Sequence, residues 1–159
     1  MVSELGHFIL ISAFCLNLGL IANCISNNSI LVGYTSFFNK LESLLLTLLV
    51  ISFLLLVISF ITSDFSLKLV ANNSHSLKPF LYKFAGAWGN HEGSMLLWVL
   101  ILTVYLFLFQ LSSRDYPNVL VRNVTLVQLS IIALFLFYLL VFSNPFERLD
   151  IPPLNGQDL

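Results

Sequence analysis

The stretch of residues 41–61, LESLLLTLLVISFLLLVISFI, decides the fold of this chain. After Glu42 it contains no charged residue, and its length matches the roughly 20 apolar residues that a helix needs to cross a bilayer. Apolar and polar residues do not alternate along it, as they would in a strand of a membrane barrel. The stretch therefore predicts a transmembrane helix.

Three further stretches of the same character flank it, at residues 5–25, 93–111 and 124–142. Of the 159 residues, 58% are hydrophobic and 9% are charged, whereas a soluble domain carries roughly 25% charged residues. We therefore expect an all-α, polytopic membrane helix bundle of about four transmembrane helices, surrounded by lipid. The net charge of −1 offers no basic surface, which argues against a nucleic-acid partner.

The segments outside these stretches divide the basic residues into two groups. Residues 62–92 form a long connection, and residues 143–159 form a tail whose prolines favour extended backbone. One group is Lys40, Arg114 and Arg122, and the other is Lys68, Lys78, Lys83 and Arg148. The first group lies in shorter loops close to the span ends, where positive charge favours the inner side of a membrane. We therefore expect both termini, the 62–92 loop and the tail on the outer side.

The start of the third stretch, WGNHEGSMLLW at residues 88–98, places an imidazole and a carboxylate at the edge of an apolar run. Ala85, Gly89 and Gly93 recur every four residues. In one continuous helix they would form a stripe of small residues that lets another helix approach closely. His91 would lie roughly 200° around that helix from Gly89, facing away from the stripe.

Three interpretations of His91 and Glu92 stay open from the residues alone. Both side chains can anchor the helix at headgroup depth, where charges cost little. They can instead face the outer aqueous side as a surface for a ligand, or form a proton relay, to which the later spans add only Gln110 and Gln128. One histidine beside one carboxylate is too few ligands for a metal ion, so no metal site is assigned.

Several short segments, taken in order, resemble the N-terminal part of one membrane protein family. The most specific is WGNHEGS at residues 88–94, and the order and spacing of the other segments agree with it. The others are Glu4-Leu5-Gly6, Ser63-Asp64-Phe65, Val70-Ala71-Asn72-Asn73-Ser74, Ser143-Asn144-Pro145-Phe146-Glu147-Arg148 and Gly156-Gln157-Asp158-Leu159. Together they resemble CcmF, the large membrane component of the haem lyase that matures cytochromes c.

The resemblance implies a role in cytochrome c maturation. CcmF-like proteins take haem from the carrier protein CcmE and help attach it to apocytochrome c through thioether bonds, together with thioreduction and chaperone subunits. They reside in a bacterial inner (plasma) membrane or a mitochondrial inner membrane. They are longer than this chain, so we expect residues 1–159 to be an N-terminal transmembrane portion. Its missing partner is either the remainder of a truncated CcmF sequence or the other product of a split gene.

The family's haem-binding elements, a tryptophan-rich external segment and axial histidines, are expected to follow this portion. Trp88 and Trp98 are the only tryptophans here, so the resemblance assigns no axial ligand to His7, His75 or His91. We expect no catalytic residue in this chain and no haem ligation by it alone, which leaves its assignment as part of an enzyme open.

Residues 62–93 supply the candidate surface for haem or a partner. The candidate side chains are Asn73, Lys78, Lys83, Trp88, His91 and Glu92. The tryptophan offers an apolar plane, while the lysines and the asparagine can meet polar groups such as haem propionates. Alternatively, WGNHEGS only packs the bundle, with Ala85, Gly89 and Gly93 as a seam for another helix. In a different functional class, the chain is a subunit of an ion- or proton-translocating complex, or a structural scaffold.

Overall fold

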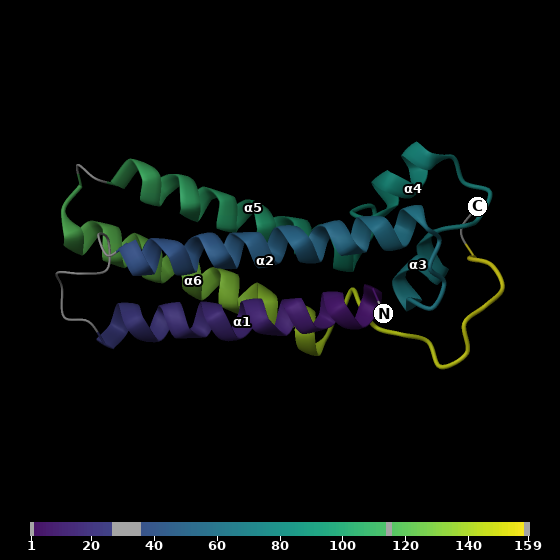
Figure 1. Cartoon of the computed structure of the whole chain (residues 1–159), viewed down its shortest axis with the longest axis horizontal. Helices are drawn as coiled ribbons and strands as arrows, with labels where there is room; N and C mark the ends of the chain where they lie inside the picture. The colour runs from purple at the N-terminus through teal and green to yellow at the C-terminus, as the bar shows by residue number, and fades with distance from the viewer. Residues whose placement is uncertain (1, 27–35, 114–115, 158–159) are drawn as a thin grey trace.

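The computed structural model describes residues 2–26, 36–113 and 116–157, and these parts of the chain contain six helices (Figure 1). The helices are α1 (Val2–Ser26), α2 (Ser36–Ile61), α3 (Lys68–Asn73), α4 (Phe80–Gly86), α5 (His91–Ser112) and α6 (Asn118–Val141). Arg114, Asp158 and Leu159, which entered the predictions, lie outside the described residues.

Four of these helices are long and apolar enough to cross a membrane, which confirms the predicted all-α membrane bundle. The spans are Val2–Ser26, Phe38–Ile61, His91–Ser112 and Asn118–Val141. Helix α1 packs against α2 and α6, and α5 packs against the same two helices, so the four form a closed ring of neighbours. Neighbouring helices run antiparallel along the long axis of the bundle (Figure 1). The chain is a multi-pass membrane protein.

The helices extend beyond the predicted apolar stretches, mainly at their polar ends. The fourth was predicted to begin at Val124, but it begins at Asn118. The reason is packing, because Val121 in its first turn is fully buried and holds the helix together past Arg122. Hydropathy marks the part of a helix that crosses hydrocarbon, whereas packing determines how far the helix continues.

Each spanning helix buries one narrow face. On α1 the buried side chains recur every three or four residues, at Leu10, Ala13, Asn17, Leu20 and Cys24. The other faces expose large apolar side chains such as Phe8 and Leu134, which are 65% and 70% exposed. Such exposure is expected of a bundle in lipid, where the solvent is as apolar as the side chains.

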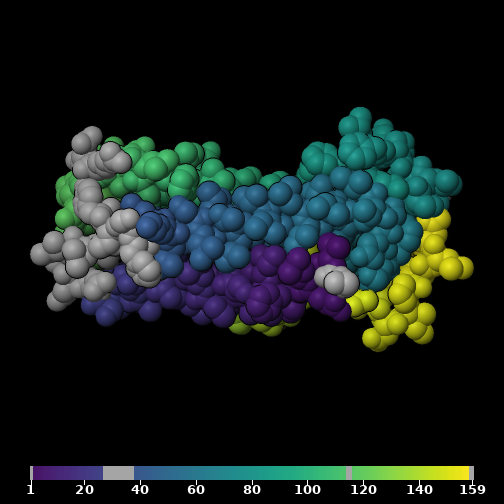
Figure 2. Space-filling model, in the orientation of Figure 1, coloured from purple at the N-terminus to yellow at the C-terminus, as the bar shows by residue number. Residues whose placement is uncertain are grey.

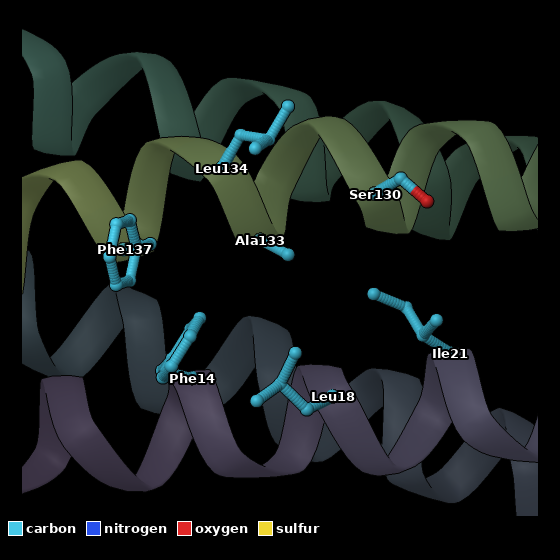
Figure 3. Close-up of a pocket in the computed structure, with 7 residues that line it drawn as sticks. All are labelled: Phe14, Leu18, Ile21, Ser130, Ala133, Leu134 and Phe137. Atoms are coloured by element: carbon cyan, nitrogen blue, oxygen red, sulfur yellow. The ribbon is translucent and has the colours of Figure 1, made fainter.

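A groove of about 350 Å³ lies between α1 and α6 (Figure 3). Its lining includes Phe14, Leu18 and Ile21 of α1 and Ser130, Ala133 and Phe137 of α6. The hydroxyl of Ser130 donates to Leu126 O over 2.7 Å, within its own helix. The groove therefore presents an apolar surface suited to hydrocarbon.

At one end of the bundle, the start of α1, the helices α3 and α4 and the C-terminal tail gather together (Figure 1). Residues 62–92, predicted as one loop, contain both short helices, and α3 is held in place by buried apolar side chains. The tail is extended and turn-rich, as its prolines predicted, and Leu67 and Arg148 form an isolated antiparallel bridge. We call residues 62–90 and 143–157 together the platform.

Candidate functional site

Two consecutive tail residues contact two histidines at the platform end of the bundle. Ser143 Oγ lies 3.1 Å from Nδ1 of His91, the first residue of α5. Asn144 Nδ2 donates to His7 Nδ1 of α1 over 2.9 Å. The His91 ring also stands edge-on to Tyr138 of α6, with 6.0 Å between the ring centroids. The tail thus couples the starts of α1 and α5, and it brings the Ser-Asn-Pro-Phe segment to WGNHEGS.

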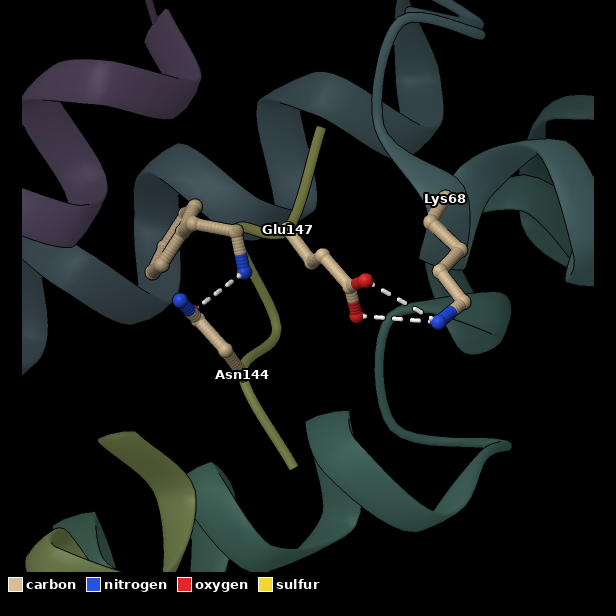
Figure 4. Close-up of polar contacts among 4 residues, drawn as sticks. Lys68, Asn144 and Glu147 are labelled. Carbon is tan, nitrogen blue, oxygen red and sulfur yellow. Dashed lines mark hydrogen bonds and ion pairs between the residues drawn. The ribbon is translucent and has the colours of Figure 1, made fainter. Parts of the chain in front are cut away.

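A tight turn after Asn144 seats Phe146 in the end of the bundle. Asn144 Oδ1 accepts a hydrogen bond from Phe146 N over 3.0 Å (Figure 4). Phe146 is 3% exposed, and a Cβ added at Gly6 of α1 would overlap its ring. Gly6 is therefore needed for the close approach of the tail to α1.

Two ion pairs hold the next residues of the tail. Lys68 Nζ of α3 lies 3.0 Å from both carboxylate oxygens of Glu147 (Figure 4), and Lys68 N donates to Glu147 O over 3.0 Å. Arg148 Nη1 lies 2.6 Å from Glu4 Oε1 of α1. About half of each charged side chain is exposed, so the pairs orient the tail and add little stability.

The last described part of the tail closes against the segment that follows α3. Asn155 Oδ1 accepts from Ser76 N over 3.0 Å, and Asn155 Nδ2 donates to Ser76 Oγ over 2.9 Å. A Cβ added at Gly156 would overlap the carbonyl oxygen of Ser74. Only glycine fits at this position, which gives a physical reason for the glycine in the final family-like segment.

The WGNHEGS segment starts a helix and is not the interior of a longer one. Helix α4 ends at Gly86, and α5 begins directly after its N-cap, Asn90. Asn90 Oδ1 accepts from Gly93 N, and Asn90 Nδ2 donates to Gly86 O, both over 2.7 Å. The predicted stripe of Ala85, Gly89 and Gly93 along one helix is therefore wrong, because the capped turn separates the three residues.

Gly93 instead serves the turn itself. A Cβ added there would overlap the carbonyl oxygen of Ala87, a residue that is 0% exposed. Ala85, at the end of α4, and Gly89, within the turn, are exposed. That these two residues contact another helix stays a prediction. It no longer rests on a shared face of one helix.

Trp88 lies in an aromatic cluster that joins the end of α4 to α2. Its ring stacks on Phe53 at a centroid distance of 6.4 Å and meets Phe84 edge-on at 4.9 Å. Phe80 extends the row by stacking on Phe84 at 6.5 Å. Part of the apolar plane predicted for haem is therefore covered by the chain's own rings.

The polar candidates fall into two separate contacts. Lys78 Nζ donates to Asn73 O of α3 over 3.4 Å, so the structure brings these two candidates together. Lys83 Nζ instead contacts Ser63 Oγ over 2.6 Å, in the turn after α2 where Ser63 has a φ of 54°. Lys83 thus steadies a left-handed turn that few residues other than glycine adopt.

Ligation of haem iron requires an imidazole, thiolate or similar group held in an enclosed site. Among the described residues, no three His, Cys, Asp or Glu side chains lie close enough to hold a metal ion by themselves, whereas haem iron needs only one or two axial ligands. His91 is exposed and Glu92 is partly buried at the start of α5, with His91 Nδ1 facing Ser143. The residues present fit a surface that a partner can contact better than they fit an axial-ligand pocket.

A second polar site, which sequence reasoning missed, lies at the opposite end of the bundle. Gln110 Nε2 of α5 donates to Glu42 Oε1 of α2 over 3.1 Å and to Thr125 Oγ1 of α6 over 2.8 Å. Glu42 is 2% exposed, Gln110 7% and Thr125 0%. We call these three residues the Glu42 cluster. In a hydropathy profile, each of these three residues is an isolated polar position in an apolar stretch. The sequence therefore does not indicate that they contact one another.

The glutamines considered for a proton relay serve different helix contacts. Gln110 belongs to the Glu42 cluster, whereas Gln128 Nε2 of α6 donates to Leu102 O of α5 over 3.0 Å. Asn17 Nδ2 of α1 similarly donates to Leu129 O of α6 over 3.2 Å. These amides join helices to one another, as polar side chains within membrane bundles commonly do.

Comparisons with known proteins point to one family. Residues 88–158 match the family described as Cytochrome C assembly protein. The chain is 43% identical over 162 residues to the cytochrome c-type biogenesis protein CycK of Rhizobium meliloti (strain 1021), which covers all of this chain and 24% of that protein. It is 39% identical over 168 residues to the cytochrome c-type biogenesis protein CcmF of Pseudomonas aeruginosa, with the same coverage.

A solved structure agrees with this. The cytochrome c haem lyase CcmF has a TM-score of 0.73 and 26% identity to this chain, over 92% of this chain and 24% of that one. The chain belongs to the CcmF family. It corresponds to the N-terminal part of CcmF and spans about a quarter of the length of these relatives. These relatives confirm the prediction that the chain belongs to a family of cytochrome c maturation proteins. No comparison supports the alternative, a subunit of an ion- or proton-translocating complex.

Proposed function

We propose that this chain is the N-terminal, membrane-spanning portion of a CcmF-type haem lyase, and that it supplies the structural and docking platform for haem transfer to apocytochrome c. The main support is the meeting of the family-like segments at one end of the bundle. WGNHEGS and Ser-Asn-Pro-Phe touch through His91 and Ser143, which are 52 positions apart in the chain. Two of the segments that carry the resemblance thus pack together at one end of the bundle.

The platform would position the rest of the lyase. Its tail is fixed at several points, from the buried Phe146 to the double hydrogen bond between Asn155 and Ser76. A surface fixed in this way loses little conformational freedom when a partner binds to it. On this proposal, His91 and Glu92 contact the partner at the start of α5, while Trp88 stiffens the junction between α4 and α2.

The remainder of the CcmF protein, or its split partner, would ligate the haem. The haem supplies the vinyl groups to which the cysteine thiols of apocytochrome c add. No catalytic role is assigned to this chain's own side chains. Lys78 and Lys83 lie where positive charge can favour the approach of acidic groups, including haem propionates.

The proposed partners approach from the outer side of the membrane, at the platform end. They are the haem carrier protein CcmE, and apocytochrome c with its thioreduction and chaperone subunits. The membrane is a bacterial inner (plasma) membrane or a mitochondrial inner membrane. This orientation is supported by the placement of Lys40 and Arg122 at the opposite end, close to the ends of the spans.

Substitution of the two residues at the start of α5 tests the docking role. His91→Ala and Glu92→Ala are introduced into the complete protein in cells that lack their own copy. We expect c-type cytochromes, measured by haem staining, to fall severalfold while the protein level on immunoblots stays normal. Tyr105→Ala is the control, because Tyr105 is 63% exposed on α5 away from the platform.

Normal cytochrome c maturation and normal haem retention in both variants would reject the docking role. Gly89→Leu separates docking from packing, because it adds bulk at an exposed position of the turn before α5. A lower protein level in Gly89→Leu, with His91→Ala and Glu92→Ala unaffected, would favour a role in packing alone.

A further inference from the structure

Helix α4 and the residues before it expose large apolar side chains at the platform end. Leu77 is 77% exposed, Phe80 60% and Leu81 72%. Phe84 is 40% exposed, and no residue of α4 is buried. Contact of so much apolar surface with water is unfavourable, and exposed apolar patches of this kind mark contact surfaces.

The aromatic cluster determines where α4 lies along the axis of α2. Trp88, just after α4, stacks on Phe53, which lies roughly 12 Å before the end of α2 at 1.5 Å per residue. At the end of α4, a Cβ added at Gly86 would lie 3.0 Å from the ring of Phe60 in the last turn of α2. Helix α4 therefore lies beside the last turns of α2 and does not stand beyond them (Figures 1 and 2).

The last turns of α2 end the candidate membrane span Phe38–Ile61 at the platform end of the bundle. Helix α2 has 26 residues and a length of roughly 39 Å, which exceeds the roughly 30 Å of bilayer hydrocarbon. Its exposed apolar side chains continue to Leu54 and Ile58, which are 51% and 45% exposed. The lipid-facing surface of the bundle thus reaches the depth at which α4 lies.

Helix α4 contains one charged side chain, Lys83, and its exposed side chains are mainly apolar or aromatic, including Tyr82, which is 69% exposed. Phe80, Leu81 and Phe84 share one face, because residues three and four apart lie side by side on a helix. Lys83 Nζ points elsewhere, to Ser63 Oγ in the turn beyond the end of α2. Exposed apolar and aromatic side chains, with a lysine whose amino group reaches past the end of the neighbouring span, are features of a helix that lies in the membrane interface.

We propose that α4 is an interfacial anchor whose apolar face inserts into the phospholipid of the leaflet at the platform end. Lys78 and Lys83 then lie at the level of the headgroup phosphates, whose negative charge complements theirs. The occupant is lipid because the apolar face continues the lipid-facing surface of the bundle at the same depth. The anchor fixes residues 62–90 against the bilayer and leaves the tail side of the platform for protein partners.

Fluorescence of a single tryptophan measures the depth of α4. The chain carrying Trp88→Phe, Trp98→Phe and Leu81→Trp is reconstituted in phosphatidylcholine vesicles that contain lipid brominated either near the headgroup or near the middle of the acyl chain. An interfacial helix lies about 5–10 Å into the headgroup boundary, so we expect about twofold stronger quenching by the shallow bromines. Leu134→Trp on α6 is the matched control, and the deep bromines should quench it more strongly.

Ile151→Trp on the tail, where Ile151 is 86% exposed, is the aqueous control and should not be quenched by either lipid. Quenching of Leu81→Trp no greater than that of this control would overturn the proposal. A second measurement keeps both native tryptophans and so does not depend on Trp88→Phe. In cells, p-benzoylphenylalanine replaces Leu81 in the complete protein, and light should yield a phospholipid adduct. Adducts with protein alone would also overturn the proposal, since they would show that another polypeptide covers α4.

Discussion

The platform and the Glu42 cluster lie at opposite ends of one bundle and use polar side chains in different ways. The ion pair of Lys68 and Glu147 on the platform is about half exposed, and it orients a tail that Phe146 already anchors. In the Glu42 cluster, one buried amide joins three helices. The comparison teaches that burial, more than the number of bonds, determines how much a polar contact contributes to stability. A buried group that loses its partner cannot form a replacement hydrogen bond with water.

The largest loss of stability is expected where a substitution adds an atom that overlaps a backbone atom of the neighbouring turn. Gly93→Ala places its Cβ on the carbonyl oxygen of Ala87, and we expect a loss of about 3 kcal/mol, the upper end for overpacking. Thermal denaturation of the detergent-solubilised chain measures it. Gly19→Ala is the matched control, because nothing lies within 4 Å of its added Cβ, and it should be neutral or gain up to about 1 kcal/mol. Equal destabilisation by the two would contradict the geometry of the turn before α5.

The next effect concerns the Glu42 cluster. Gln110→Leu leaves the buried Glu42 carboxyl without its donor, and we expect a loss of about 2 kcal/mol. Gln128→Leu is the matched control, because it removes a single bond to Leu102 O, which is worth about 0.6 kcal/mol on average in membrane bundles. Replacing both Glu42 and Gln110 by leucine should recover most of the loss. If Gln110→Leu were as stable as Gln128→Leu, the cluster would not act as a unit.

The smallest effect is expected on the platform. Glu147→Gln should lower stability by less than about 1 kcal/mol and only at low ionic strength, because the pair with Lys68 is exposed and screened by salt. Unfolding measured at low and high salt tests both statements. Asp150→Asn, another exposed acid of the tail, is the control. If the loss of stability from Glu147→Gln were the same at high salt, the ion pair would not be screened by solvent. The contrast between the exposed platform pair and the buried Glu42 cluster would then be wrong.

The sequence predicted the four membrane-spanning helices, because each contains a run of roughly 20 apolar residues, long enough to cross the hydrocarbon. It did not predict α3 and α4, since neither is long enough to be stable without its tertiary contacts. The error over Ala85, Gly89 and Gly93 was avoidable. Asn90 is a favoured N-cap residue, and Glu92 follows it in the first turn, so the start of α5 was present in the sequence.

The contacts that define the two ends could not be predicted in the same way. His91 meets Ser143 and Gln110 meets Glu42 across 52 and 68 positions of the chain, and no local pattern encodes such pairs. From the sequence, the basic residues predicted that both termini, the 62–92 loop and the tail lie on the same side of the membrane, but nothing indicated which of these residues touch. Hydropathy gave no indication of the Glu42 cluster.

The central claim is that the tail and residues 62–90 form one fixed platform that the haem lyase requires. Ser76→Cys with Asn155→Cys tests it directly, because Asn155 Nδ2 donates to Ser76 Oγ over 2.9 Å and the two side chains are therefore in contact. In the complete protein with Cys15→Ser and Cys24→Ala, the pair should cross-link in cells and still support normal levels of c-type cytochromes. Failure to cross-link, or loss of cytochrome c maturation in the cross-linked protein, would contradict the account.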